Sequence, residues 1–193
     1  LVTDRSVLSW DWSNNYSENV AKNQLYIKWS IISYNTIWWS SSTPTKCPFY
    51  ISSCTYDEAK KYEIVENGTM VIVNEDRVNK GIYFYGPPAG YEINSLVHTL
   101  IDIGGAGEPI PEDLLLRIQN IDKDVDIKVF IGLGCPHCPG AVISAHTLAK
   151  YNPRIKGIMV ESSSYEELSK KFNVSSVPRI IINDGQADIL GNQ

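Results

Sequence analysis

The chain lacks the long apolar runs and the basic clusters that would tie it to a membrane or to nucleic acid. Its longest apolar stretches fall far short of the roughly 20 residues that span a bilayer, so we expect no membrane span. With 17 Lys and Arg against 22 Asp and Glu, the net charge is −5. This balance argues against nucleic acid and anionic membranes as partners. Leu1 is not an initiator Met and no signal peptide follows it, so we expect a processed or trimmed chain.

Cysteine is also scarce, with four residues among 193, and these form two pairs in different surroundings. Cys135-Pro136-His137-Cys138 directly follows an apolar run rich in β-branched residues, 127–131, which predicts a strand. The stretch that follows, 138–150, has the apolar periodicity of a helix. A Cys-x-x-Cys pair at a strand-to-helix junction predicts redox chemistry on thiols.

A proline strengthens this interpretation. Val177-Pro178 directly precedes another apolar run, 179–182. An X-Pro step that leads a later strand, together with the Cys-x-x-Cys pair, is the active-site plan of a thioredoxin fold. Only X-Pro bonds adopt cis at modest cost, so we expect Pro178 to be cis. The Val177 backbone would then pair with a substrate peptide beside the sulfurs, as an added strand would.

The tetrad assigns a role to each of its residues. Cys135 would lie at a helix N-terminus, where unpaired N–H groups and the helix dipole favour a thiolate, so it is the expected nucleophile. Cys138, one turn further on and more buried, is the expected resolving thiol. Pro136 restricts the first turn and lacks a donor that the helix start does not use. His137 would stabilise the thiolate, which makes the disulfide a stronger oxidant than one in a Cys-Gly-Pro-Cys site.

The second pair, Cys47 and Cys54, predicts a disulfide that closes a loop. Pro48 and the neighbouring serines mark this segment as a loop. The six residues between the two cysteines do not place both thiols on one helical turn. A zinc site would need these thiols or His146 to converge on the tetrad, because zinc takes four ligands. We therefore expect neither a metal nor a cofactor.

The second half of the chain predicts one α/β unit. Strands are expected at 127–131, 155–160, 179–182 and 187–190, and helices at 138–150 and 165–172. Their order, βαβαββ, is that of thioredoxin without its last helix, which is missing after Gln193. Either the natural chain continues or another element covers that face of the sheet.

The first half repeats this plan in degenerate form. Strands are expected at 7–12, 36–40, 70–74 and 81–85, and helices at 17–32, 56–62 and 91–103, with an entry helix for the second half at 112–121. We therefore predict an α/β protein of two tandem thioredoxin-like domains, each a central mixed β-sheet flanked by helices. The predicted domains are 1–103 and 121–193, and a linker with an entry helix, 104–120, connects them.

The chemistry does not repeat with the fold. Asn14-Asn15-Tyr16-Ser17 stands where the second half has its tetrad, and Gly68-Thr69 stands where it has Val177-Pro178. Both thiols and the proline are absent from these positions. The first half is therefore interpreted as a redox-inactive copy that is kept for structure or recognition.

Three segments resemble the protein disulfide oxidoreductases of archaea and some thermophilic bacteria, which join two thioredoxin- or glutaredoxin-like units. They are residues 83–92, residues 121–125 and residues 135–142. The family commonly has a Cys-x-x-Cys pair in each unit and a Tyr inside the second pair, whereas this chain has one pair and His137. The tetrad also looks like that of strongly oxidising bacterial periplasmic thiol oxidases. The resemblance implies exchange with protein thiols and disulfides at one centre, and a reductase or oxidase as redox partner.

A second function class stays open, namely a structural or assembly protein, exported or filament-forming. It would use the fold as a scaffold and Cys135–Cys138 as a structural disulfide. Asn15, Asn67 and Asn173 each begin an N-glycosylation sequon. The sequons and the Ser-, Asn-, Tyr- and Trp-rich N-terminal segment favour an extracytoplasmic location, with the cytoplasm of a thermophile as the alternative. Both function classes are compatible with a homo-oligomer.

Overall fold

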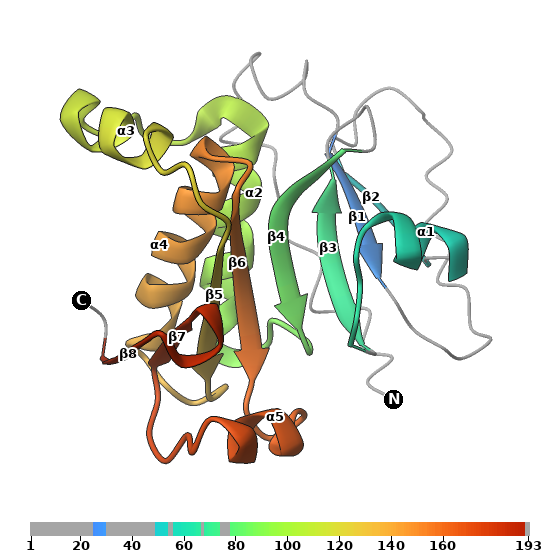
Figure 1. Ribbon diagram of the computed structural model, residues 1–193. Helices are drawn as coiled ribbons and strands as arrows, with labels where there is room; N and C mark the ends of the chain where they lie inside the picture. Colours follow the sequence, from blue (N-terminus) through green and yellow to red (C-terminus); the bar gives the residue numbers. More distant parts are fainter. Residues whose placement is uncertain (1–24, 30–48, 54–55, 67, 74–77, 192–193) are drawn as a thin grey trace.

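The strands of both halves belong to one continuous sheet. A computed structural model of the chain describes residues 25–29, 49–53, 56–66, 68–73 and 78–191. Within them, eight strands form a mixed sheet in the order β2-β1-β3-β4-β6-β5-β7-β8 (Figure 1). Helices pack on both faces of this sheet, so the predicted α/β class is confirmed.

In the second half, β5 (Val125–Ile131) is the central strand. It pairs in parallel with β6 (Ile155–Glu161) and antiparallel with β7 (Arg179–Ile182). The last strand, β8 (Ala187–Leu190), pairs antiparallel with β7. These four strands begin and end within two residues of the predicted ranges.

The first half repeats this pairing pattern. Strand β1 (Leu25–Trp29) pairs in parallel with β2 (Phe49–Ser53) and antiparallel with β3 (Thr69–Val73). Strand β4 (Asn79–Tyr85) pairs antiparallel with β3. The two sets of four strands meet where β4 runs parallel to β6. This junction makes one sheet from two similar halves.

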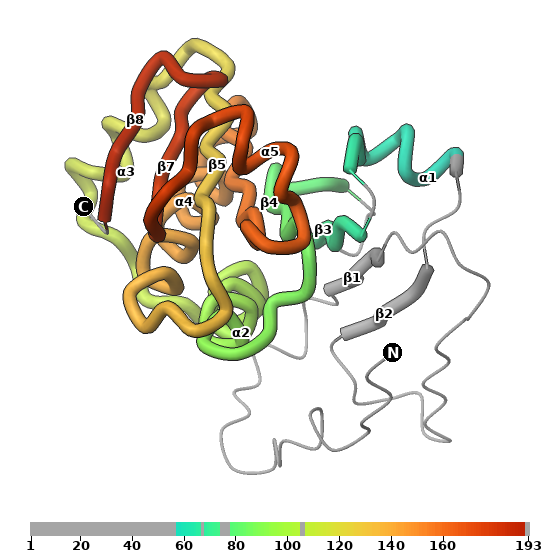
Figure 2. Tube along the Cα trace, turned by 90° about the horizontal axis from the view of Figure 1, so that it is seen from below, coloured from blue at the N-terminus to red at the C-terminus, as the bar shows by residue number. Residues whose placement is uncertain are grey.

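The helices divide between the two faces of the sheet (Figure 2). One face carries α2 (Ile93–Ile101), α3 (Glu112–Gln119) and α4 (Cys138–Tyr151), and the other carries α1 (Tyr56–Lys61) and α5 (Glu166–Lys171). Side chains alternate along β5 accordingly: Val129 belongs to the core under α4, and Phe130 to the core under α5. Because both faces are covered, the central strands are apolar almost throughout.

The junction between the halves is packed around Phe84. This side chain on β4 is fully buried, and its ring centroid lies 4.7 Å from that of His146 on α4, edge to face. On the neighbouring strand β6, a Cβ at Gly157 would lie 2.6 Å from the carbonyl oxygen of Ala145. The missing side chain therefore lets α4 pack directly against the strands of the junction.

Two predictions for the first half are wrong. Residues 25–29 lie inside the predicted helix 17–32 but form β1, because pairing with a strand on each side supplies backbone partners that local periodicity does not reveal. Residues 49–53 follow Pro48 in the predicted loop but form β2. The strands predicted at 7–12 and 36–40 lie outside the described residues.

The position of β1 also corrects the predicted counterpart of the tetrad. By its pairing, β1 takes the place that β5 has in the second half. The equivalent of the tetrad therefore follows Trp29, whereas residues 14–17 precede this strand. Residues 30–46 contain no cysteine, so the first half has no Cys-x-x-Cys pair at this position. No helix among the described residues is long and apolar enough to cross a bilayer.

Candidate redox site

The C-terminal ends of β4, β5 and β6 lie at one edge of the sheet, because the three strands are parallel. In open α/β sheets, this is the edge at which ligands and reactive groups are usually found. Four loops meet there: residues 86–91, 132–137, 162–165 and 172–178. The first comes from the first half of the chain, and the other three come from the second half.

The tetrad lies at this edge, between the end of β5 and the start of α4. Cys135 is half-buried, and its N–H donates to the carbonyl oxygen of Gly132 at 2.9 Å. Cys138 is the first residue of α4 and is fully buried. The two form a disulfide with their Cα atoms 5.5 Å apart. Cys135 therefore keeps part of its surface exposed, whereas Cys138 is enclosed by protein.

The outer residues of the tetrad, Pro136 and His137, are exposed. His137 is the N-cap residue of α4, and its side chain makes no capping hydrogen bond. The first N–H groups of a helix have no partners inside the helix, and they carry the positive end of its dipole. This environment favours an anionic sulfur, as the predicted role of Cys135 requires. The roles of the four residues stay predictions.

Val177 and Pro178 lie beside the loop that leads to Cys135. Pro178 is buried, and the Val177–Pro178 peptide bond is cis. A Cβ at Gly132 would lie 3.5 Å from Val177 Cγ2, so the two loops are in ordinary contact. The structure thus brings together the tetrad and the Val-Pro step, which are far apart in the sequence.

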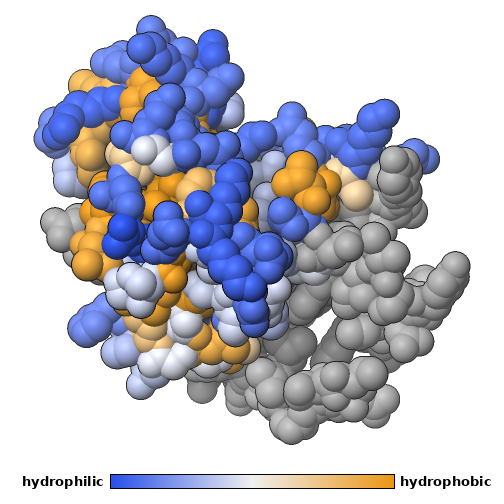
Figure 3. Space-filling model, turned by 60° about the horizontal axis from the view of Figure 1, so that its bottom comes forward, coloured by the Kyte–Doolittle hydropathy of each residue, from blue (hydrophilic) through white to orange (hydrophobic). Residues whose placement is uncertain are grey.

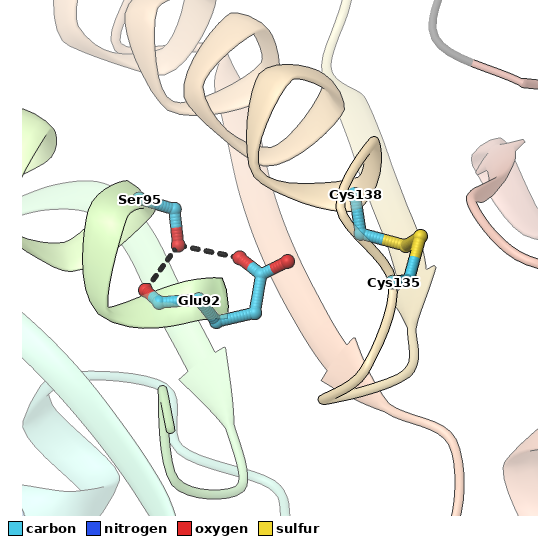
Figure 4. Close-up of a disulfide and its surroundings, with 4 residues drawn as sticks. All are labelled: Glu92, Ser95, Cys135 and Cys138. Atoms are coloured by element: carbon cyan, nitrogen blue, oxygen red, sulfur yellow. Dashed lines mark hydrogen bonds between the residues drawn. A yellow bond between two sulfur atoms is a disulfide. The ribbon is translucent and has the colours of Figure 1, made fainter. Parts of the chain in front are cut away.

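Sequence reasoning missed an acidic residue at this site. Glu92 lies at the end of the loop that follows β4, directly before α2, and it is fully buried. Its carboxyl group is on the side of α2 that faces the Cys135–Cys138 disulfide (Figure 4). The loop after β4 can lie this close to the loop after β5 because residue 90 is a glycine. Gly90 has a positive φ of 58°, and any Cβ there would clash with the carbonyl oxygen of Leu133.

The contacts of Glu92 indicate a protonated carboxyl group. Ser95 Oγ lies 2.7 Å from the Glu92 carbonyl oxygen and 2.5 Å from Glu92 Oε2. A hydroxyl has one proton to donate, so both contacts are fully satisfied only if the carboxyl group carries a proton itself. Among the described residues, no group bonds Oε1. Burial raises the pKa of Glu92 above its ordinary value, and the hydrogen bond with Ser95 offsets this only in part.

A second buried acid, Glu161, differs from Glu92 in its hydrogen bonds. Its carboxylate accepts from Ser163 N–H at 3.1 Å, Ser163 Oγ at 2.6 Å and Ser164 N–H at 2.7 Å. Burial alone would raise the pKa of Glu161, but these donors outweigh burial and lower it. Glu161 is therefore held as an anion that fixes the loop after β6, whereas Glu92 is suited to exchange a proton.

His146 on α4 belongs to the core and not to the redox site. Its Nδ1 lies 3.0 Å from Thr99 Oγ1 on α2, and its ring packs against Phe84. Burial lowers the pKa of His146 to about 3, so the imidazole is neutral at physiological pH. The hydrogen bond between His146 and Thr99 links α4 to α2.

The remaining predicted sites are spread over different parts of the chain. Cys47, Cys54, Asn15 and Asn67 lie outside the described residues. Asn173 is exposed in the loop before β7, in the left-handed conformation with φ 51°.

Comparisons with known proteins agree with this geometry. Residues 125–193 match the protein family described as thioredoxin domain. The chain is 32% identical over 105 residues to the AhpF subunit of alkyl hydroperoxide reductase of Escherichia coli and 27% identical over 111 residues to an NADH dehydrogenase of Ferdinandcohnia aciditolerans. These matches cover 54% and 58% of this chain but 20% and 21% of the relatives, so the chain spans about a fifth of their length.

Two solved structures share the architecture. The AhpF subunit of alkyl hydroperoxide reductase of Enterococcus faecalis superposes with a TM-score of 0.76 at 24% identity, over 90% of this chain and 87% of that one. A protein disulfide oxidoreductase of Aeropyrum pernix gives 0.72 at 20% identity, over 86% and 80%. At this identity the likeness shows the fold alone. The predicted thioredoxin-like fold is thereby confirmed, and the Cys135–Cys138 disulfide lies in the segment that matches the thioredoxin domain.

Proposed function

We propose that the chain is a thiol–disulfide oxidoreductase that exchanges disulfides with protein substrates through the single centre Cys135/Cys138. The strongest support is the pairing of a half-buried Cys135 with a fully buried Cys138 at the first turn of α4. Exchange needs one thiol that a partner can reach and a second that acts only within the mixed disulfide. The difference in burial provides both.

In the reducing direction, the Cys135 thiolate attacks one sulfur of a substrate disulfide and expels the other as a thiolate. The Cys138 thiol then loses its proton and attacks the Cys135 sulfur. The Cys135–Cys138 bond forms, the bond to the substrate breaks, and the second substrate thiolate leaves. Two electrons have passed to the substrate. The oxidising direction reverses each step, and a reductase or oxidase restores the starting state of the pair.

We propose Glu92 as the group that exchanges a proton with Cys138. A thiol that is buried in apolar surroundings ionises poorly, so its attack depends on a proton acceptor nearby. Glu92 faces the disulfide, and its pKa is raised towards the pH at which such an acceptor works best. After the reaction, the neutral carboxyl group returns the proton when the pair is reduced again.

His137 and Val177 would complete the centre. The exposed imidazole of His137, next to Cys135 in the tetrad, can donate to the thiolate and so stabilise the reduced state. The backbone of Val177 can pair with an extended substrate segment at the edge of the sheet. Pro136 and Pro178 shape the two turns that present these groups.

We also propose that the chain divides into a redox-inactive unit, 1–103, a connecting segment, 104–120, and a redox unit, 121–193. The repeated pairing of β1 to β4 and β5 to β8 supports two units of common design. The match of residues 125–193 to the thioredoxin domain supports the limits of the second unit.

Reduction of insulin disulfides and refolding of reduced ribonuclease test the proposal in both directions. The wild-type chain should catalyse at least one of the two reactions, and Cys135→Ser should abolish it because no nucleophile is left. Cys138→Ser serves as the matched control, since it should still attack and accumulate a mixed disulfide that mass spectrometry detects. A wild-type chain that is silent in both assays would support the alternative function, in which Cys135–Cys138 is a structural disulfide in an assembly protein.

A further inference from the structure

A tyrosine of the second half, Tyr165, reaches into the first half at the edge of the sheet that carries the disulfide. It is the last residue of the loop after β6, directly before α5. Its N–H donates to the carbonyl oxygen of Glu161 at 3.1 Å, and its carbonyl oxygen accepts from Ser169 N–H at 2.9 Å. Its half-buried ring lies 5.7 Å, centroid to centroid, from that of Tyr85 at the end of β4. Tyr165 is therefore a firmly held link across the junction.

The hydroxyl group of Tyr165 is hydrogen-bonded to two points of the first half, the side chain of Thr69 and the backbone of Gly86. Thr69 Oγ1 donates its own proton to the carbonyl oxygen of Glu66 at 2.7 Å. A hydroxyl has one proton to donate, so the Tyr165 hydroxyl donates to Thr69 and accepts from Gly86 N–H. One hydroxyl group of the second half therefore joins two loops of the first half.

Two glycines of the first half make room for the Tyr165 side chain. A Cβ at Gly68 would lie 3.2 Å from Tyr165 Oη, and a Cβ at Gly86 would lie 3.4 Å from Tyr165 Cε2. The Cβ at Gly86 would also lie 2.9 Å from Glu161 Cβ, at the end of β6. Gly86 N–H donates to the carbonyl oxygen of Gly68 at 3.4 Å, so the two loops contact each other as well. The close fit of Tyr165 depends on the absence of side chains at both positions.

The position that Tyr165 contacts has a counterpart in the second half. By strand register, Gly68 and Thr69 take the place that Val177 and Pro178 have there. The Val-Pro step is proposed to pair with a substrate segment, whereas the Gly-Thr step is bonded to a side chain of the same chain. The first half therefore uses this position to attach the loop after β6.

The loop that begins at Gly86 leads to Glu92, which faces the disulfide. Figure 3 brings this edge of the sheet forward and shows hydrophobic side chains at the surface of the second half between hydrophilic ones. Surface loops are more mobile than the elements that they connect unless bonds fix them. This loop is fixed by the second half at both ends, because Tyr165 bonds Gly86 and Tyr91 N–H donates to the carbonyl oxygen of Leu133 at 3.2 Å. The position of Glu92 depends on these two attachments.

We propose that Tyr165 is a positioning residue for the redox reaction, because its hydroxyl group fixes the start of the loop after β4 and so holds Glu92 in place for Cys138. The inference rests on the proposed function and on the role proposed there for Glu92. A proton acceptor works only within hydrogen-bond reach, directly or through one water, so a small displacement of Glu92 slows the transfer strongly. Attack by Cys135 on the substrate needs no proton transfer to Glu92, so this step does not depend on Tyr165.

Tyr165→Phe tests the proposal, because it removes the hydroxyl group and keeps the ring. Formation of the mixed disulfide with a disulfide peptide is measured in the Cys138→Ser background, where it accumulates. Release of the second peptide thiol is measured with both cysteines in place. Tyr165→Phe should slow this release by about 5- to 10-fold and change formation by less than about twofold. Thr69→Val, which removes the partner of the same hydroxyl group, should act alike. Tyr151→Phe, at the far end of α4, is the matched control and should change neither rate.

A double variant separates positioning of Glu92 from a merely structural role. In Glu92→Gln the proton acceptor is already lost, so adding Tyr165→Phe should slow release no further. The proposal is overturned if the two slowings multiply, if Tyr165→Phe slows formation as much as release, or if it behaves like Tyr151→Phe. In those cases the proposed function still stands. If Glu92→Gln releases the thiol at the wild-type rate, the role of Glu92 and this inference both fail. A chain that forms no mixed disulfide and releases no thiol overturns the proposed function as well.

Discussion

The two halves of the chain share one plan of strand pairing and differ in chemistry. In both, a central strand has a parallel neighbour on one side and two antiparallel strands in succession on the other. In the first half Met70 pairs with Trp29, and at the corresponding position of the second half Arg179 pairs with Phe130. By this register Gly68-Thr69 occupies the place of Val177-Pro178, as predicted. The two halves therefore differ at corresponding loop positions, and only the second half has the Cys-x-x-Cys pair and the Val-Pro step.

The comparison also shows that the first half is not separate from the site. Strand β4 runs beside β6, and this brings the loop after β4 to the tetrad. Glu92 and Tyr91, which lie next to each other at the end of this loop, come from the half without the tetrad. The first half therefore forms one wall of the site in the second half, although it has no Cys-x-x-Cys pair of its own.

The largest expected effect comes from breaking the junction between the halves. Phe84→Ala removes a fully buried ring that packs on α4, so it should lower the free energy of unfolding by about 3–5 kcal/mol. Urea unfolding followed by far-ultraviolet circular dichroism measures this. Leu116→Ala, on the exposed side of α3, should stay within about 0.5 kcal/mol of the wild type. Equal losses in both variants would mean that the halves are not held together by this packing.

The next effect tests whether the first half contributes chemistry. Glu92→Gln keeps the shape of the neutral side chain but cannot accept a proton. Resolution of the mixed disulfide by Cys138 should therefore slow by about 100-fold, the lower end of what a positioned proton acceptor contributes. Single-turnover release of a fluorescent substrate thiol measures this step. Glu161→Gln is the control, because it neutralises another buried acid. If both variants slow resolution of the mixed disulfide equally, the slowing comes from the loss of a buried acid in general and not from lost proton transfer.

Glu92 also makes a prediction for stability against pH. Because burial raises its folded-state pKa above 4.5, the folded protein favours the protonated acid. This contribution is fully present below the unfolded-state pKa and is lost as the pH rises through the folded-state pKa. The wild type should therefore lose stability relative to Glu92→Gln from about pH 4.5 upwards. Urea midpoints of both proteins between pH 4 and pH 8 measure the difference, and parallel curves would contradict the prediction.

A smaller effect is expected for His137, which tunes the second half alone. A charge-assisted hydrogen bond contributes about 1.5–3 kcal/mol, and about 30 mV corresponds to about 1.4 kcal/mol for this two-electron couple. His137→Tyr should therefore lower the reduction potential by some tens of millivolts, measured by equilibration with thiol buffers. His98→Tyr, at an exposed position on α2, is the control and should leave the potential in place. An unchanged potential in His137→Tyr would remove the tuning role.

The sequence predicts the second half closely and the first half in part. The run 127–131, the tetrad and the Val-Pro step are local signals, and the elements around them lie where these signals indicate. Residues 25–29 carry no comparable signal, because their pairing with β2 and β3 depends on residues far away in the chain. The burial of Glu92 is equally non-local. A glutamate at the start of a helix is ordinarily a solvent-exposed partner of the helix dipole, whereas here the loop of Glu92 packs against Leu133, more than 40 residues further along the chain.

The ladder between β4 and β6 limits how partners can reach the sulfurs. Ile82, Tyr83, Phe84 and Tyr85 each pair with a residue of β6, and separating the halves would break this ladder and expose the buried side chains around Phe84. The molecule has no low-cost way to swing open along this line. Under the proposed function, oxidant and reductant would therefore both have to reach Cys135 at the open rim of the sheet, one after the other.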